Sequence, residues 1–347
     1  WFNRFKFFGF NAIIRVLNSL STRVGNIGGG FLGYQTGSYL IWVTVLISIG
    51  EGAIKLIYFF HKSLSSLGAI SIKEICRLLK RYKKFPIIDT WSILLNVSSI
   101  QVAPLLIALF FSSSEVGYYA QGMRLIQLPM VLVGSAIAQV YYQRAAQALH
   151  EGKLNRIVDD VVKNLIFLGA FPFLVLGIFG EELFSFFLGH RWAEAGVYAQ
   201  LLSPWCLIAF VLSPVSTTLL VIEKQESLLL FNLISLITRV LSLYVGFKIG
   251  SCRYAILLYS LTGTALGFGL ISYLFAMSRL PVFKTWFFNL KSIFPAIIMA
   301  LPLLIIKSQI SILSHKLILI TFVMIMMTVY VFRKEKKTIL SLISNIS

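Results

Sequence analysis

Residues 228–247 read LLLFNLISLITRVLSLYVGF, a run of mostly apolar residues that is long enough to cross a bilayer as a helix. Polar residues interrupt it, among them Asn232, Ser235, Arg239 and Ser242. Their spacing of i, i+3, i+7 and i+10 places them on one helical face. The run therefore predicts a transmembrane helix with a polar stripe along one side.

The composition of the whole chain extends this interpretation. Of its 347 residues, 58% are hydrophobic and 13% are charged, and the mean hydropathy is +0.85. A soluble domain carries about 25% charged residues, so a water-soluble globule is excluded. Long apolar runs argue against a β-barrel, whose strands alternate over about ten residues. We therefore expect an all-α, polytopic membrane bundle.

The apolar runs predict about ten transmembrane helices. Their approximate bounds are 7–28, 36–60, 86–111, 117–140, 162–183, 197–222, 228–247, 254–278, 290–306 and 317–332. Two prolines, Pro295 and Pro302, fall in the short ninth run. The net charge of +18 is explained by topology. One set of alternate loops carries 21 Lys and Arg residues, and the opposite set carries five. The basic set is predicted to be cytoplasmic, which also places both ends of the sequence in the cytoplasm.

The longest internal loop divides the chain. We expect residues 1–61 to form the last two helices of an N-terminal lobe and 62–84 to be a cytoplasmic linker. Residues 85–278 would form a C-terminal lobe of six helices, and 279–347 a helical hairpin with a basic tail. Within the linker, one face of a predicted helix is apolar and the other basic, which is typical of a helix lying on anionic lipid. The apolar face holds Ile72, Ile75, Leu78 and Leu79, and the basic face Lys73, Arg77 and Lys80.

Seven charged residues inside the predicted spans stand out, because a charge costs about 2.5–3.5 kcal/mol near the bilayer centre. They are Arg15, Arg23, Lys55, Arg124, Arg239, Glu51 and Asp89. Glu51 and Lys55 are spaced i, i+4 and would neutralise each other as an ion pair. The remaining excess of cations favours an anionic ligand, and arginine binds phosphate or pyrophosphate particularly well.

Polar residues accompany these charges on three further helices. The stripes are Asn11, Arg15, Asn18 and Thr22; Asp89, Ser92, Asn96 and Ser99; and Gln121, Arg124, Ser135 and Gln139. Two interpretations stay open: hydrogen bonds between packed helices, or the wall of a water-filled cavity. For the arginines we favour the cavity, because a guanidinium with five donors is hard to satisfy in a dry bundle. Candidate ligand-binding residues are Arg15, Arg124, Arg239, Asn18, Asn96 and Gln121, with Glu51, Lys55 and Asp89 as coupling or structural charges.

No motif for catalysis or for a cofactor was found. The histidines His61, His150, His190 and His315 are dispersed, and the acidic pair Asp159–Asp160 is explained by a helix start. Gly28-Gly-Gly is followed by Phe rather than by the residues of a phosphate-binding loop. Cys76, Cys206 and Cys252 form no CxxC motif. We therefore expect neither an enzyme, a metal site, a cofactor nor a nucleic-acid partner.

Several stretches resemble bacterial oligosaccharide-lipid flippases in order and spacing. They are Arg81-Tyr-Lys-Lys-Phe-Pro; Leu94-Leu-Asn; Pro104-Leu-Leu-Ile; Val116-Gly-Tyr-Tyr-Ala-Gln-Gly-Met-Arg-Leu-Ile-Gln-Leu-Pro129; Gly134-Ser-Ala-Ile-Ala-Gln-Val; Leu188-Gly-His-Arg-Trp-Ala-Glu-Ala-Gly196; and Ser213-Pro214-Val-Ser. They are similar to Wzx-like translocases of O-antigen or capsule repeat units, within the multidrug/oligosaccharidyl-lipid/polysaccharide exporter superfamily. The likeness covers about residues 1–280.

The resemblance implies a two-lobed bundle that flips an undecaprenyl-pyrophosphate-linked oligosaccharide across the bacterial inner membrane by alternating access. It implies membrane lipids, a polysaccharide polymerase and chain-length machinery as partners, and Arg124 stands where the family has a recurring arginine. It also implies that the first four helices of the family precede Trp1. Alternatives are a cation-coupled multidrug exporter or peptidoglycan-precursor flippase of the same superfamily, and a polytopic polysaccharide polymerase.

Overall fold

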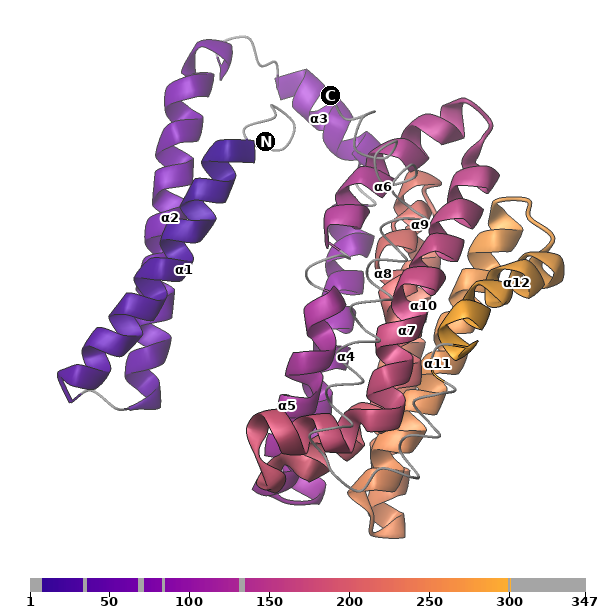
Figure 1. Ribbon diagram of the computed structural model, residues 1–347. Helices are drawn as coiled ribbons and strands as arrows, with labels where there is room; N and C mark the ends of the chain where they lie inside the picture. The colour runs from indigo at the N-terminus through magenta and orange to yellow at the C-terminus, as the bar shows by residue number, and fades with distance from the viewer. Residues whose placement is uncertain are drawn as a thin grey trace. The chain divides into compact units, whose positions relative to one another are not determined.

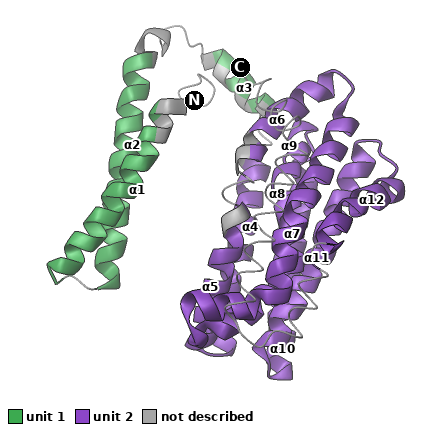
Figure 2. Ribbon diagram, viewed as in Figure 1, with its two compact units in different colours: residues 1–82 green, residues 83–347 purple. Residues whose placement is uncertain are grey.

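The computed structural model of the chain describes residues 8–33, 36–67, 72–82, 85–130, 135–298 and 300, and every regular element in these ranges is helical (Figure 1). This confirms the prediction of an all-α fold. The chain divides into two compact units, Trp1–Tyr82 and Lys83–Ser347 (Figure 2). Each unit is described by itself below.

The first unit contains the helices α1 (Phe8–Phe31), α2 (Gly37–Leu67) and α3 (Ile72–Tyr82). The helices α1 and α2 form an antiparallel hairpin (Figure 1). The two helices pack closely at Gly29, because the ring of Tyr39 occupies the space that a side chain at Gly29 would need. The Tyr39 hydroxyl also donates to the carbonyl oxygen of Gly25, at 3.2 Å. The helix α3 covers the basic, amphipathic stretch that the sequence predicted to be helical.

The second unit begins with a short π-helix and continues through longer helices. Its elements are η1 (Phe85–Asp89), α4 (Thr90–Phe110), α5 (Ser113–Pro129), α6 (Ser135–His150), α7 (Leu154–Leu188), η3 (His190–Trp192), α8 (Ala193–Val215), α9 (Thr218–Val221), α10 (Gln225–Ile249), α11 (Cys252–Met277), α12 (Val282–Leu290) and η4 (Lys291–Ile293). The helix α8 packs against α5, α7 and α11, and α10 packs between α11 and α4. The buried apolar core runs mainly through α7, α8 and α11. The side of α8 and α11 that faces α4 and α10 carries more polar residues.

Local sequence signals fix several helix ends in this unit. The Ser112 side chain accepts a hydrogen bond from the backbone N–H of Glu115 at 3.3 Å, which caps the start of α5. At the end of α10, Gly250 adopts a left-handed conformation with φ of 80°, which favours glycine. The backbone N–H of Gly250 bonds back to Phe247 O at 2.9 Å. These signals place the turn between α10 and α11, so that the two helices return side by side.

Six helical segments in the described residues are long and apolar enough to cross a membrane. They are Gly37–Lys62, Ile87–Phe110, Leu154–Leu188, His190–Val221, Gln225–Ile249 and Cys252–Met277. Each corresponds to one of the ten predicted spans. The first predicted span is the helix α1, but Asn, Ser, Thr and Arg side chains lower its hydropathy. The fourth is divided between α5 and α6, with 131–134 outside the described residues. The tenth span and the last part of the ninth, residues 301–306, also lie outside them.

Candidate functional site

A pocket of about 350 Å³ lies inside the second unit, among α4, α8, α10 and α11. This volume falls in the range of small-molecule sites. The pocket is lined by residues 92–100 of α4, 205–216 of α8, 228–239 of α10 and 263–267 of α11, together with two residues at the end of α5. Among the described residues that line it, Arg239 is the only charged one. The pocket therefore combines an apolar frame with a single cation.

Arg239 is held in place by a hydroxyl and two aromatic rings. It is only 8% exposed, and its Nη1 donates to Ser99 Oγ at 2.6 Å. The guanidinium carbon lies 5.3 Å from the centre of the Trp205 ring and 5.2 Å from that of Tyr259. Such contacts attract a cation through the negative faces of the rings. Gly263 makes room for Trp205, since a Cβ there would lie 2.4 Å from the Trp205 ring.

No carboxylate in the described part of the chain pairs with Arg239. A buried cation is ordinarily paired or hydrogen-bonded, because removing it from water carries a large desolvation cost. Ser99 satisfies one of the five guanidinium N–H donors. Because Arg239 borders the pocket, the arrangement leaves a desolvated positive charge with donors available for an anion that enters it.

The polar stripes of α4 and α10 face each other. The Asn232 amide donates to Ser92 O at 3.0 Å and to Ser92 Oγ at 2.8 Å, and Arg239 meets Ser99 two turns further along. In both pairs the two residues are 140 positions apart in the sequence. The helices α4 and α10 therefore run parallel, with their polar stripes in contact. Ser92 and Ser99 therefore bond across the interface, as the packing interpretation predicts, while Asn96, between them, lines the pocket.

Replacing Asn232 with Leu is expected to lower the free energy of unfolding by about 1 kcal/mol. Hydrogen bonds between membrane helices contribute about 0.6 kcal/mol on average and up to about 1.7. Thr238→Val is the matched control, because the Thr238 hydroxyl bonds only within α10, to Ile234 O at 2.9 Å and Ser235 O at 3.1 Å. Denaturation of the purified variants in detergent measures the free energy of unfolding of each. Equal stability of the two variants would show that the bonds to Ser92 do not hold α4 against α10.

The other predicted ligand residues of the second unit lie outside the pocket. Arg124 is exposed on α5 and Gln121 is half-buried on the same helix, and neither lines the pocket. Asp89 ends η1, and its Oδ1 is buried without a hydrogen-bond partner in the described structure. The structure therefore brings Asn96 and Arg239 to one pocket and leaves Arg124, Gln121 and Asp89 apart from it.

The predicted charges of the first unit form their own cluster. Lys55 and Glu51 make the ion pair that their spacing predicts, one helical turn apart on α2. Asn18 on α1 donates to the same carboxylate, at 2.5 Å from Glu51 Oε2. Asn18 therefore contributes to the packing of α1 on α2. Arg15, on the same helix, is exposed.

Sequence reasoning missed Trp205 and Tyr259, the aromatic partners of Arg239. Both stand in apolar runs where an aromatic residue is unremarkable, and each lies on a different helix from Arg239, α8 for Trp205 and α11 for Tyr259. The proline before Trp205 and the small Gly263 opposite it are the only local signs of an unusual packing site. Neither sign identifies an arginine as the partner without the fold.

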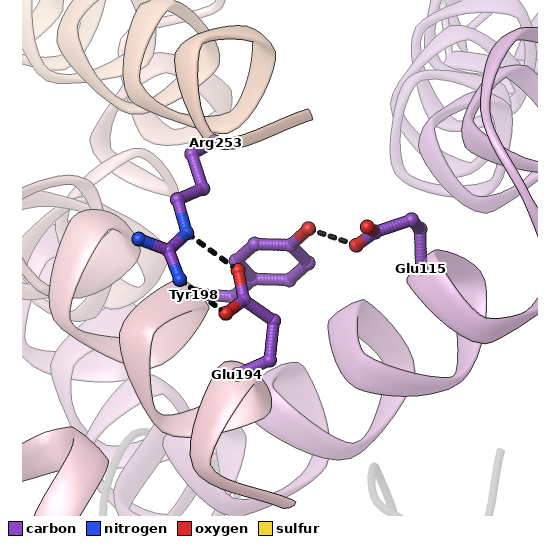
Figure 3. A network of polar contacts seen from close by, with 4 residues as sticks. All are labelled: Glu115, Glu194, Tyr198 and Arg253. Carbon is purple, nitrogen blue, oxygen red and sulfur yellow. Dashed lines mark hydrogen bonds and ion pairs between the residues drawn. The ribbon is translucent and has the colours of Figure 1, made fainter. Parts of the chain in front are cut away.

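A second polar cluster joins the beginnings of α5, α8 and α11 (Figure 3). Arg253 donates to Glu194 with both Nε, at 2.7 Å, and Nη2, at 2.5 Å. One turn along α8, the Tyr198 hydroxyl donates to Glu115. Arg253 and Glu194 neutralise each other, and the Glu115 carboxylate is held by the Tyr198 hydroxyl. The cluster therefore ties three helices together and, unlike the pocket at Arg239, offers no unpaired cation to an anionic ligand.

Arg253→Gln is expected to change the free energy of unfolding by less than about 1 kcal/mol. The Arg253 side chain is 59% exposed, and exposed ion pairs contribute about 0–1 kcal/mol even when well formed. The effect should shrink further at high salt, which screens exposed charges. Denaturation in low and high salt tests this. A loss of several kcal/mol would instead mark the cluster as a main support of the unit.

Comparison with known proteins gives one match. Residues 34–197 match the profile of a family described as "Polysaccharide biosynthesis protein". The matched segment runs from before α2 into the first turns of α8, and so ends before the α10 and α11 walls of the pocket. Searches of curated proteins and of solved structures found no match.

Proposed function

We propose that this chain acts as a flippase, moving an undecaprenyl-pyrophosphate-linked oligosaccharide from the cytoplasmic to the periplasmic leaflet of the bacterial inner membrane. The family match supports a role in polysaccharide biosynthesis or export. The observation that carries the proposal is the buried, unpaired guanidinium of Arg239 beside a pocket in an apolar helical unit. Such a group suits a cargo with an anionic, hydroxyl-rich head and an apolar tail.

The physical task is to carry a polar head group through hydrocarbon. Amide and hydroxyl groups without partners cost several kcal/mol each in an apolar medium, and charges cost far more. A pocket with fixed donors replaces the lost hydration, while the lipid tail remains in the bilayer beside the protein. No bond in the cargo is made or broken, so the role needs no catalytic group.

The charge pattern supports loading from the cytoplasmic side. In the predicted orientation, α4 and α10 start at the cytoplasmic face and α8 ends there. The pocket uses residues 92–100 near the start of α4 and 205–216 near the end of α8. It also uses 228–239 from the first half of α10. All three segments fall in the cytoplasmic half of the membrane, where the lipid-linked unit would be collected.

The remaining candidate residues receive separate roles in this proposal. Arg124 is exposed on the second unit and would contact the pyrophosphate, with Gln121 beside it bonding sugar hydroxyls. Arg15, exposed on the first unit, is a further candidate for an anionic group. Asp89 would provide the charge for ion coupling. The pair of Glu51 and Lys55, with Asn18, stabilises the α1–α2 hairpin.

Depletion of the full-length protein in its own bacterium tests the proposal. Lipid-linked repeat units should accumulate on the cytoplasmic leaflet, where a periplasmic glycosidase added to spheroplasts does not reach them. Loss of a polymerase would instead leave single repeat units on the outer leaflet, open to the enzyme. Normal distribution of the repeat unit, combined with sensitivity to organic cations, would favour a drug exporter and contradict the proposal.

A further inference from the structure

The single positive charge in the pocket limits which anions the pocket can bind. Arg239 is the only charged residue among the described residues that line it, and Trp205 and Tyr259 flank its guanidinium. A pyrophosphate linker carries a negative charge on each of two phosphates. One largely buried cation would leave part of that charge uncompensated in a pocket framed by packed helices, which is unfavourable. A group with a single negative charge matches the single guanidinium.

A carboxylate fits the shape of the available donors. The guanidinium presents parallel N–H groups in a planar fork, and a carboxylate accepts two such bonds in the same plane. Ser99 holds one Nη1 donor, at 2.6 Å, and fixes the plane of the fork. A neutral hydroxyl would form weaker bonds and would leave the buried charge unbalanced.

The other polar groups of the pocket suit sugar hydroxyls. Amide side chains of Asn96, Asn232 and Gln127 line it, as do the hydroxyls of Ser213 and Ser216. Amides both donate and accept, as sugar hydroxyls do. The volume of about 350 Å³ is at the lower end of the range for ligand sites, which suits one sugar residue better than a whole repeat unit with its lipid.

We infer that the pocket of the second unit is a subsite for one acidic sugar, a hexuronic acid residue of the transported repeat unit, whose carboxylate pairs with Arg239. The inference rests on the proposed function, since it names the part of the cargo that this pocket receives. In this arrangement Arg239 holds the sugar carboxylate, and the exposed Arg124 would contact the pyrophosphate.

Calorimetric titration of the purified full-length protein tests this with three probes: glucuronate, glucose and inorganic pyrophosphate. Glucuronate should bind at least about tenfold more tightly than glucose, as expected for a charge-assisted pair. Arg239→Gln should abolish that preference, while Arg191→Gln, which removes an exposed arginine outside the pocket, should retain it. Asn96→Leu should weaken binding of both sugars and keep the preference for charge. Arg239→Gln should still bind glucose, which guards against a folding defect in that variant.

Three results would overturn the inference. Glucose could bind as tightly as glucuronate, pyrophosphate could bind more tightly than glucuronate in an Arg239-dependent way, or none of the probes could bind. Each leaves the leaflet assay of the proposed function unaffected, because that assay follows the lipid-linked unit whatever its sugars are. A normal leaflet distribution after depletion would overturn the proposed function instead, even where glucuronate binds.

Discussion

Cells that carry Arg239→Gln in the full-length protein are expected to display at least about tenfold less surface polysaccharide than wild-type cells at equal protein levels. The variant keeps a polar side chain, although a shorter one, and removes the only charge that lines the pocket among the described residues. Loss of a hydrogen-bonded charge pair with the cargo corresponds to about 1.5–3 kcal/mol, which is about a tenfold to more than a hundredfold change in affinity. Immunoblots of the protein and of the polysaccharide measure the effect.

Arg239→Lys separates charge from geometry in the same assay. Lysine retains the positive charge but lacks the planar fork, so it should restore only part of the export. It would also lose the paired ring contacts that Trp205 and Tyr259 make with the flat guanidinium. Unchanged export in Arg239→Gln would remove this arginine from cargo binding and leave it a packing residue. The Arg191→Gln variant controls for a general loss of positive charge.

The polar stripes were the part of the site that the sequence could predict. Spacing of three and four residues along α4 and α10 identified the faces that carry Ser92, Asn96, Asn232 and Arg239, and the structure packs these two faces together. The spacing of residues on one helix says which side chains share a face. It does not say which helix lies opposite, so the same reasoning grouped Arg124 with Arg239 although Arg124 lies on the exposed side of α5.

The contacts around the arginine depend on packing between segments far apart in the chain. Trp205 approaches Arg239 because Gly263 on α11 leaves space for its ring. The bonds of Tyr198 to Glu115 and of Arg253 to Glu194 likewise join residues that are 83 and 59 positions apart. No local pattern encodes such pairs, since each partner alone resembles an ordinary residue near a helix end. The fold class, by contrast, follows from composition and from the length of the apolar runs.

The largest structural effect is expected at the crossing of α7 and α8. A Cβ at Gly196 would lie 2.3 Å from Gly180 O and 2.6 Å from Glu181 Cα, and a Cβ at Gly180 would lie 2.6 Å from Gly196 O. These are backbone atoms, which cannot move aside as a flexible side chain can. Gly196→Leu should therefore push the two helices apart and lower the free energy of unfolding by about 3 kcal/mol or more, at the upper end of overpacking effects.

Gly269→Leu on α11 is the matched control for this prediction. It introduces the same side chain at a helical glycine whose Cβ would meet no atom within 4 Å, so only the small gain in helix propensity remains. Thermal denaturation of both purified variants, with the yield from membranes as a second measurement, gives the comparison. Because α8 also carries Trp205, Gly196→Leu should weaken sugar binding in the pocket as the helix shifts. Equal midpoints for the two variants would mean that α7 and α8 are not in backbone contact at this crossing.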